Sequence, residues 1–590
     1  MNIIKNVNQK WAGLLNSGER YPLAILFLLI AAILNMVMIQ NNWDHFSTFY
    51  FVCMIGAALA VVAQQIYETI FKTRLERMLL LAAAMLLTIG YYFAVHQPDY
   101  FNIEISTKSA VLVFALLIFF IWIPSAKKEV AFHESFMASF KAFFTALLFA
   151  VVLTIGMEAI IFAVDQLIVK VNAKIYAHVL NIIFILFAPI FFLSFIPLYP
   201  RRNTELTKAQ QEKFSRAVHC PKMVHILISY IIIPLTMIYT TILLIYVLLN
   251  ITGDFWNDNL LEPMLISYAI IVILVYFLAS SLDNLVVTVF KNIFPKILIP
   301  IVLFQTIASI LKIGEIGITN GRYYVIMFGV FALIAGVIFS FFPMKNHGWI
   351  AMFLIVFAIV SITPPVDAFS VSRANQIALL KDTLTENDML EDGDIIPNED
   401  VSEKDQKTIT MTVSYLERFD YTKDISWLPD SIYQPKEFEE TFGFQEKYEE
   451  TSNEPNNFQS ANVDWDTAQA LDIQGYDQMV YIDMNFQYPG ENKEQTIPLK
   501  IDDSDYEIQK EAENYKLKLI LKDEDHELMT FDVTKAFSQI LQKEHADSLS
   551  VDDATVTEEN EDVKMTLITS TIHYDESEYT GEIYLFIKIK

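Results

Sequence analysis

The sequence predicts a polytopic α-helical membrane protein with about eleven transmembrane helices and a C-terminal soluble α+β domain. Residues 1–360 contain a series of apolar runs of about twenty residues, the length that a helix needs to cross a bilayer core of about 30 Å. Charge is divided unevenly: residues 1–360 hold 23 basic and 17 acidic residues, whereas residues 361–590 hold 19 and 52. The net charge of −27 therefore arises entirely from the C-terminal part.

Eleven apolar runs define a transmembrane domain over residues 21–363, which follows a short N-terminal segment, residues 1–20. The ninth and tenth runs are the least distinct, and one span fewer there would place the C-terminal part on the other side of the membrane. The runs lie at 21–39, 47–67, 78–95, 109–124, 143–168, 176–199, 223–249, 263–281, 297–311, 323–342 and 349–363.

The basic residues between the runs predict the orientation. With a cytoplasmic N-terminus, the inside segments carry 18 Lys and Arg and the outside loops carry 5. Lys and Arg near the ends of spans resist translocation, so this division favours a cytoplasmic N-terminus. Eleven spans then place the C-terminal domain outside the cell.

The C-terminal part begins after Pro364-Pro365. Residues 364–410 are interpreted as a short amphipathic helix on the membrane surface followed by an acidic linker. Residues 411–590 are predicted to form the acidic extracytoplasmic domain, with loops at 444–457 and 550–562. Alternating apolar residues predict strands at 479–486, 515–521, 564–574 and 581–589, and residues 534–543 predict a helix.

Ionisable residues inside a span are costly, so the few in this chain mark candidate sites. Glu158 and Asp165 are seven residues apart in the fifth run and face the same side of a helix. With the predicted orientation they lie in the outer half of the membrane, at the level of Lys312, Glu315 and Arg322 after the ninth run. These five residues form the candidate substrate- or ion-binding set.

Glycine disfavours helix, and the segment 312–322 contains three glycines, which predict a broken backbone. In transporters, the free amide and carbonyl groups of broken helices bind ions or anionic substrates. Two interpretations stay open. The segment is part of a polar site, or it is a tight exoplasmic loop, with Glu158 paired for packing and Asp165 at the water interface.

Three stretches carry a resemblance to a known family: 230–239, which includes Pro234 and Tyr239; 315–323, which includes Gly317, Thr319 and Tyr323; and Pro364-Pro365 with 370–376. Together they resemble a family of bacterial multi-pass membrane proteins, the domain of unknown function 4153. The family usually has arginine where this chain has Lys312, so the match rests on Glu315, Gly317, Thr319, Arg322 and Tyr323. The resemblance implies the fold and a membrane location, and brings no established activity.

Two classes of function fit these observations. The first is a transporter-like or substrate-binding membrane protein that uses the broken segment and a small-molecule or ion ligand. The second is a structural or sensory envelope protein whose exported acidic domain binds a partner. A membrane transferase acting on a lipid-linked substrate is a further alternative. We find no motif for a cofactor, a metal site, a catalytic residue or nucleic-acid binding, so the lipid bilayer is the one partner that the sequence itself requires.

Overall fold

The chain divides into two compact units, Met1–Tyr448 and Glu449–Lys590, in a computed structural model. The predicted boundary of the C-terminal domain lay earlier, after residue 410. The structure describes residues 17–42, 46–95, 103–201, 206–250, 261–391, 393–429, 432, 435–448, 459–463, 473–484, 493–501, 504–513, 516–523, 526–541, 549–575 and 578–590.

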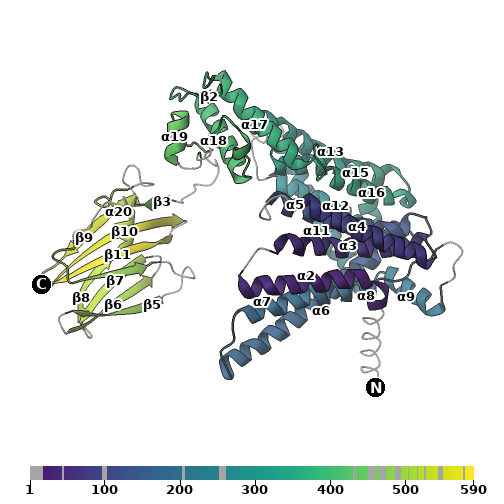
Figure 1. Cartoon of the computed structure of the whole chain (residues 1–590), viewed down its shortest axis with the longest axis horizontal. Helices are drawn as coiled ribbons and strands as arrows, with labels where there is room; N and C mark the ends of the chain where they lie inside the picture. Colours follow the sequence, from purple (N-terminus) through teal and green to yellow (C-terminus); the bar gives the residue numbers. More distant parts are fainter. Residues whose placement is uncertain are drawn as a thin grey trace. The chain divides into compact units, whose positions relative to one another are not determined.

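The first unit is a bundle of apolar helices (Figure 1). In the described part of the chain, ten helices are long and apolar enough to cross a membrane, and a shorter apolar helix spans Met344–Val360. All eleven predicted runs fall on these helices. The bounds are α2 Pro22–Asn41, α3 Ser47–Ile70, α4 Arg74–Val95, α5 Ile103–Trp122, α6 Phe132–Leu167, α7 Lys174–Asn181, α8 Ala188–Phe195, α9 Lys208–Val218, α10 Lys222–Leu227, α11 Ile233–Asn250, α12 Leu261–Ala279, α13 Leu285–Leu311, α15 Asn320–Phe341 and α16 Gly348–Val360.

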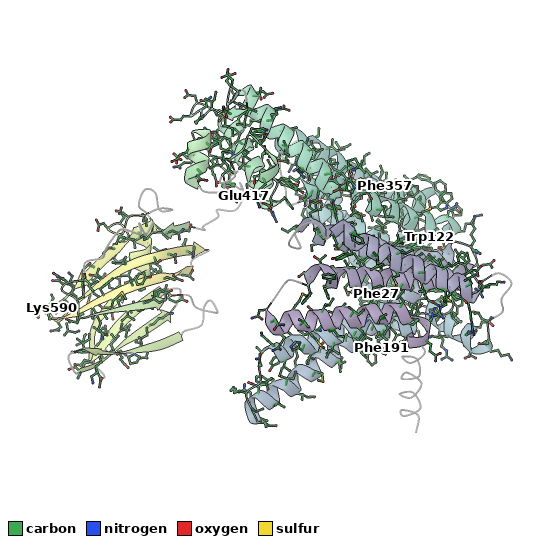
Figure 2. The ribbon with its side chains drawn as sticks, viewed as in Figure 1. Phe27, Trp122, Phe191, Phe357, Glu417 and Lys590 are labelled. Atoms are coloured by element: carbon green, nitrogen blue, oxygen red, sulfur yellow. The ribbon has the colours of Figure 1, made fainter. Side chains whose placement is uncertain are left out.

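Large apolar side chains cover the outside of the bundle. Leu86, Phe93 and Ile155 expose 69%, 67% and 65% of their surface. Exposed apolar surface of this extent is typical of a face that meets lipid. Figure 2 shows side chains of these helices; the labelled Phe27 of α2 is half-buried and the labelled Phe191 of α8 is buried. The chain is therefore a multi-pass membrane protein.

Prolines interrupt two of the spans. A π-helical turn at Ile182–Phe187 lies just before Pro189, and another at Ile228–Ile232 lies just before Pro234. Proline has no N–H to donate and its ring crowds the preceding turn, so the regular hydrogen-bond ladder cannot continue through it. A π turn is a common way to absorb such an interruption.

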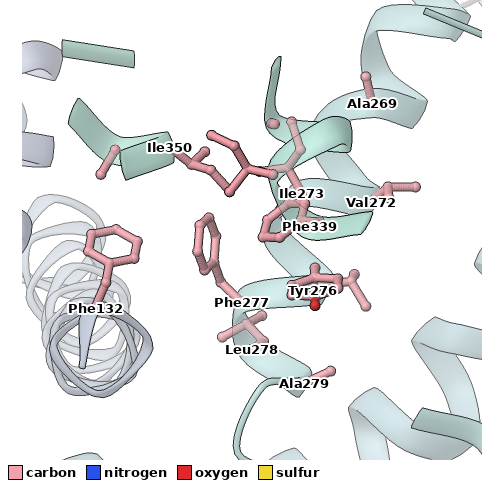
Figure 3. Close-up of a cluster of buried hydrophobic side chains, with 14 of the residues drawn as sticks. Phe132, Ala269, Val272, Ile273, Tyr276, Phe277, Leu278, Ala279, Phe339 and Ile350 are labelled. Carbon is pink, nitrogen blue, oxygen red and sulfur yellow. The ribbon is translucent and has the colours of Figure 1, made fainter. Parts of the chain in front are cut away.

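Helix α12 lies at the centre of the bundle core (Figure 3). The ring of Phe277 lies 5.0 Å from Phe132 of α6 and 5.2 Å from Phe339 of α15, measured between ring centroids. Tyr276 stacks on Phe339 at 3.9 Å. Since α12 contacts α6, α11, α13 and α15, side chains on it are well placed to face the bundle interior.

A helical subdomain follows the last apolar helix and belongs to the same unit (Figure 1). Leu380 and Leu384, which the sequence places on the membrane surface, are fully buried in a core that includes Ile409 and Phe438. Residues 385–410, interpreted as a linker from their acidity, are structured because α18 supplies its own apolar face to this core. The elements are α17 Ala368–Glu386, β1 Leu390–Glu391, β2 Asp394–Ile395, α18 Glu403–Arg418 and α19 Pro435–Phe442.

The second unit consists of two antiparallel sheets and one helix around a common core. The first sheet has the order β3-β10-β11-β4, with β9 also paired to β10, and the second has the order β5-β6-β7-β8. Helix α20 packs on β7 and β3. The bounds are β3 Gln459–Asn462, β4 Gln478–Asp483, β5 Lys493–Ile501, β6 Ser504–Glu513, β7 Lys516–Asp523, β8 His526–Asp532, α20 Val533–Leu541, β9 Thr555–Glu559, β10 Val563–Asp575 and β11 Glu578–Ile589.

The predicted helix and the four predicted strands are confirmed as α20, β4, β7, β10 and β11, apart from residues 485, 486, 515, 542 and 543, which lie outside the described part. The prediction of a loop at 550–562 was wrong, because Thr555–Glu559 forms β9 on β10. Acidic side chains can point to solvent from such a strand while its backbone pairs, so composition alone did not reveal it. Of the acidic segment 444–457, residues 449–457 lie outside the described residues.

We predict that a fragment of residues 449–590 folds on its own, because it has its own buried core. Phe537 of α20 is fully buried in that core, and Phe537→Ala should lower the free energy of unfolding by about 3–5 kcal/mol. The exposed Lys535 on the same helix provides the control Lys535→Ala, which should have little effect. Chemical denaturation followed by circular dichroism measures both. A fragment without a cooperative transition would contradict the prediction.

Candidate functional site

The backbone is broken where the glycines predict it, between α13 and α15. Helix α13 ends at Leu311, the short turn α14 spans Ile313–Ile316, and α15 begins at Asn320. Gly317 joins them with φ +72°, a conformation that costs little only for glycine. The break leaves several backbone groups without partners inside their own helices.

Side chains of the helical subdomain bind these backbone groups. Asn375 of α17 accepts a hydrogen bond from the amide of Ile318 at 2.6 Å, and Gln376 donates to the carbonyl of Ile316 at 2.9 Å. Tyr415 of α18 accepts from the amide of Asn320 at 3.2 Å. The segment therefore connects the membrane helices to the subdomain. We call residues 312–323, together with Asn375, Gln376 and Tyr415, the joint.

Charged and aromatic residues of the joint also bind backbone. The Arg322 guanidinium donates to the carbonyls of Lys312 at 3.0 Å and Gly317 at 3.4 Å. The Tyr323 hydroxyl donates to the carbonyl of Val366 at 2.5 Å. Thr319 caps α15 by accepting from the amide of Arg322. The side chain of Glu315 lies outside what the structure describes.

Glu158 and Asp165 lie elsewhere. Both belong to α6, which lies on the side of the bundle opposite α13 and α15 (Figure 1). Asp165 accepts a hydrogen bond from the amide of Val171 at 2.7 Å and pairs with Lys170 at 3.4 Å, and Glu158 is half-buried. Thus the structure brings together the joint residues Lys312 and Arg322 and places the two α6 carboxylates apart from them.

A polar face on α13 leads from the joint into the bundle. Gln305, Ser309 and Lys312 follow one another at intervals of about one turn and are 2%, 3% and 8% exposed. The Ser309 hydroxyl donates to the carboxylate of Glu262 on α12 at 2.5 Å. Neither amide atom of Gln305 has a hydrogen-bond partner among the described residues. We call Glu262, Gln305 and Ser309 the polar file.

The 230–239 stretch contacts α12 beside the polar file. Tyr239 donates to the carbonyl of Met264 at 3.1 Å, and its ring lies edge-on to Tyr268 at 6.0 Å. Thr240 donates to the Tyr268 hydroxyl at 3.2 Å. A continuous series of contacts therefore runs from α11 through α12 and α13 to the joint and α17.

A partly buried group of charges connects α17 to α5. Lys108 lies 2.6 Å from Glu104 and 2.8 Å from the fully buried Asp367, which also caps α17 by accepting from the amides of Phe369 and Ser370. Burial alone would raise the pKa of Asp367, but hydrogen bonds from Lys108 and Ser370 outweigh it and hold the pKa below its usual range. Asp367 is thus ionised at neutral pH.

The family comparison matches the part of the chain that contains most of these contacts. A family described as a domain of unknown function, DUF4153, matches residues 23–392, well over half of the chain. The chain belongs to this family. No curated protein and no solved structure matches the chain. The DUF4153 match extends through α17 and ends at β1, so it includes the polar file and both sides of the joint except Tyr415.

Sequence reasoning found the break at 312–322 but missed its partners on α17 and α18, the polar file and the charges on α5 and α17. The spacing of Gln305, Ser309 and Lys312 was a usable signal, since three polar residues at helical intervals end an otherwise apolar run. Lys108 and Asp367 gave no such signal. They are 259 positions apart, and no local pattern relates them.

We predict that Gly317→Ala destabilises the protein. A Cβ atom there would lie 2.7 Å from Gln376 Nε2 and 2.8 Å from Asn375 Oδ1, at an unfavourable positive φ, which together cost about 2–4 kcal/mol. Gly321→Ala is the matched control, because its Cβ meets nothing within 4 Å. The measurement is the thermal unfolding midpoint in detergent. Equal midpoints for the two variants would contradict the described joint.

We also predict a pH-dependent effect of Asp367→Asn. Because the folded-state pKa of Asp367 is depressed, its stabilising contribution is complete above the unfolded pKa of about 3.9 and is lost as pH falls through the folded value. The variant should lose about 2–3 kcal/mol at pH 7, the worth of a charged hydrogen bond. Thermal midpoints measured from pH 7 to pH 3 should converge for the two proteins. A constant difference over this range would contradict the assignment.

Proposed function

We propose that the protein is a transporter-like membrane protein that binds a small monovalent cation at the polar file. The observation that carries the proposal is Gln305, a buried amide with no hydrogen-bond partner among the described residues. Burying an amide without partners costs about 1–3 kcal/mol, and a bound ion or its water would offset that cost.

The composition of the polar file supports a monovalent cation. It offers one carboxylate, from Glu262, and neutral oxygens from Ser309 and Gln305. Hard cations prefer oxygen ligands, and the buried Lys312 one turn away on α13 disfavours an ion of higher charge. Polar groups inside a membrane bundle are typical of ion and solute pathways.

In this proposal the joint closes the route from the end of the bundle to the polar file. Its backbone groups are bound by Asn375 and Gln376, so they bind no solute in this arrangement. Gln305, the residue of the polar file farthest from the joint, lies about 10 Å along α13 from Lys312. Movement of α17 away from the joint would open a route from the end of the bundle to Gln305.

For orientation we propose a cytoplasmic N-terminus in a bacterial cell membrane, with the joint and the acidic unit outside. The 18 basic residues of the proposed inside segments against 5 outside favour it. An impermeant reagent should label a cysteine introduced at the exposed Lys535 in intact cells. Labelling only after lysis would contradict this orientation.

A second candidate function is an envelope protein whose C-terminal unit binds a partner. The second unit supports it: residues 449–590 hold 33 acidic and 11 basic residues and have a core of their own. Such a surface favours a cationic partner. In this alternative the membrane helices serve as an anchor, and the polar file has no role in binding.

Variants of the polar file separate the two candidates. We expect Gln305→Leu and Glu262→Gln to abolish sodium- or potassium-driven currents of proteoliposomes on a solid-supported membrane, whereas Ile307→Leu, on the exposed side of the same helix, retains them. Gln305→Leu should also raise the thermal midpoint, because it removes an unpaired buried amide. Currents that persist in Gln305→Leu, or that are absent from the wild type for both ions, would contradict the cation site.

A further inference from the structure

A hollow lies outside the polar file, where the subdomain meets the beginning of α5. Its volume is about 350 Å³, at the small end of the range of ligand pockets. Ser370, Arg373, Ala374 and Ile377 line it from one face of α17, because they are spaced by three, four and seven residues. Glu104 and Tyr421 complete the wall.

Both signs of charge meet in this wall. The Arg373 guanidinium lies 5.1 Å from the centroid of the Tyr421 ring, and the Tyr421 hydroxyl donates to Glu104 Oε2 at 3.0 Å. Lys108 binds the other Glu104 oxygen at 2.6 Å. A guanidinium carries five N–H donors around its edge, so it binds more than one partner at a time, and a carboxylate oxygen accepts more than one hydrogen bond.

The balance of charge selects the kind of ligand. Among the residues that line the hollow, Glu104 is negative and Arg373 is positive. A simple anion would meet the Glu104 carboxylate, and a simple cation would meet the Arg373 guanidinium. A zwitterion satisfies both, with an ammonium on Glu104 and an oxyanion on Arg373.

The hollow also lies at the level of lipid headgroups. Glu104 is in the first turn of α5, where a membrane span begins. The apolar side chains of Phe369 and Ile377 line the same hollow, and Ile103 and Val366, next in sequence to Glu104 and Asp367, expose 51% and 50% of their surfaces. A polar recess beside exposed apolar side chains suits a molecule with a charged head and an apolar body.

We propose that this hollow is a binding site for a zwitterionic phosphoethanolamine group, as a lipid headgroup or as a free small molecule. The phosphate binds Arg373 and the ammonium binds Glu104, beside the rings of Phe369 and Tyr421. This site is independent of the polar file and of the cation proposed there.

The experiment uses the full-length protein purified in mild detergent. Native mass spectrometry measures retention of phosphatidylethanolamine against phosphatidylglycerol, and thermal shift measures stabilisation of delipidated protein by free phosphoethanolamine. Ala374→Trp fills the hollow from an exposed position without removing any charge, and Arg373→Gln removes the phosphate ligand. The matched control is Lys381→Gln, an exposed cation farther along α17.

We expect the wild type and Lys381→Gln to retain phosphatidylethanolamine in preference to phosphatidylglycerol. Both hollow variants should weaken retention about tenfold or more, as expected for the loss of a charged contact. Stabilisation by free phosphoethanolamine as well would show that the headgroup alone suffices, and its absence would assign the site to the lipid. Equal retention of the two lipids with no effect of free phosphoethanolamine, or retention unchanged in Ala374→Trp, would overturn the proposal.

Discussion

The fold depends on hydrogen-bond partners for the backbone amides and carbonyls at the break between α13 and α15. Water is absent from the bilayer core, so each free amide or carbonyl near it needs a protein partner. Asn375 and Gln376 of α17 supply these partners at 2.6 and 2.9 Å for the segment around Gly317. A helix outside the spans therefore becomes part of the membrane fold, and the subdomain built on it belongs to the same compact unit.

The need for backbone hydrogen bonds at the break explains the structural roles of several residues that carry the family resemblance. Gly317 provides a positive φ and space for two side chains, Arg322 binds carbonyls across the break, and Tyr323 binds the backbone of Val366 just before Asp367. The stretch at 370–376 supplies the other side of the joint. Tyr239 of α11 lies farther along the same series of contacts, where it binds α12. Ser309 of the polar file lies about one helical turn before Lys312, where the joint begins.

The sequence predicted well what depends on local pattern. Apolar runs located all eleven apolar helices, three glycines located the break at Gly317, and alternation located four strands of the second unit. It predicted poorly what depends on contacts between distant segments. Glu158 and Asp165 share a face of α6, but helical spacing does not say which helix that face meets. The acidic composition of residues 385–410 concealed α18, whose buried face includes few but well-spaced apolar residues such as Ile409, Val413 and Leu416.

Amide hydrogen exchange of the segment 316–323 tests the joint most directly. In full-length protein in detergent, the amides of Ile318 and Asn320 should exchange slowly, because Asn375 and Tyr415 accept their hydrogen bonds. Asn375→Ala should release Ile318 and speed its exchange, while exchange in the middle of α15 stays unchanged. Fast exchange of Ile318 in the wild type, equal to that in Asn375→Ala, would show an open loop and contradict the joint.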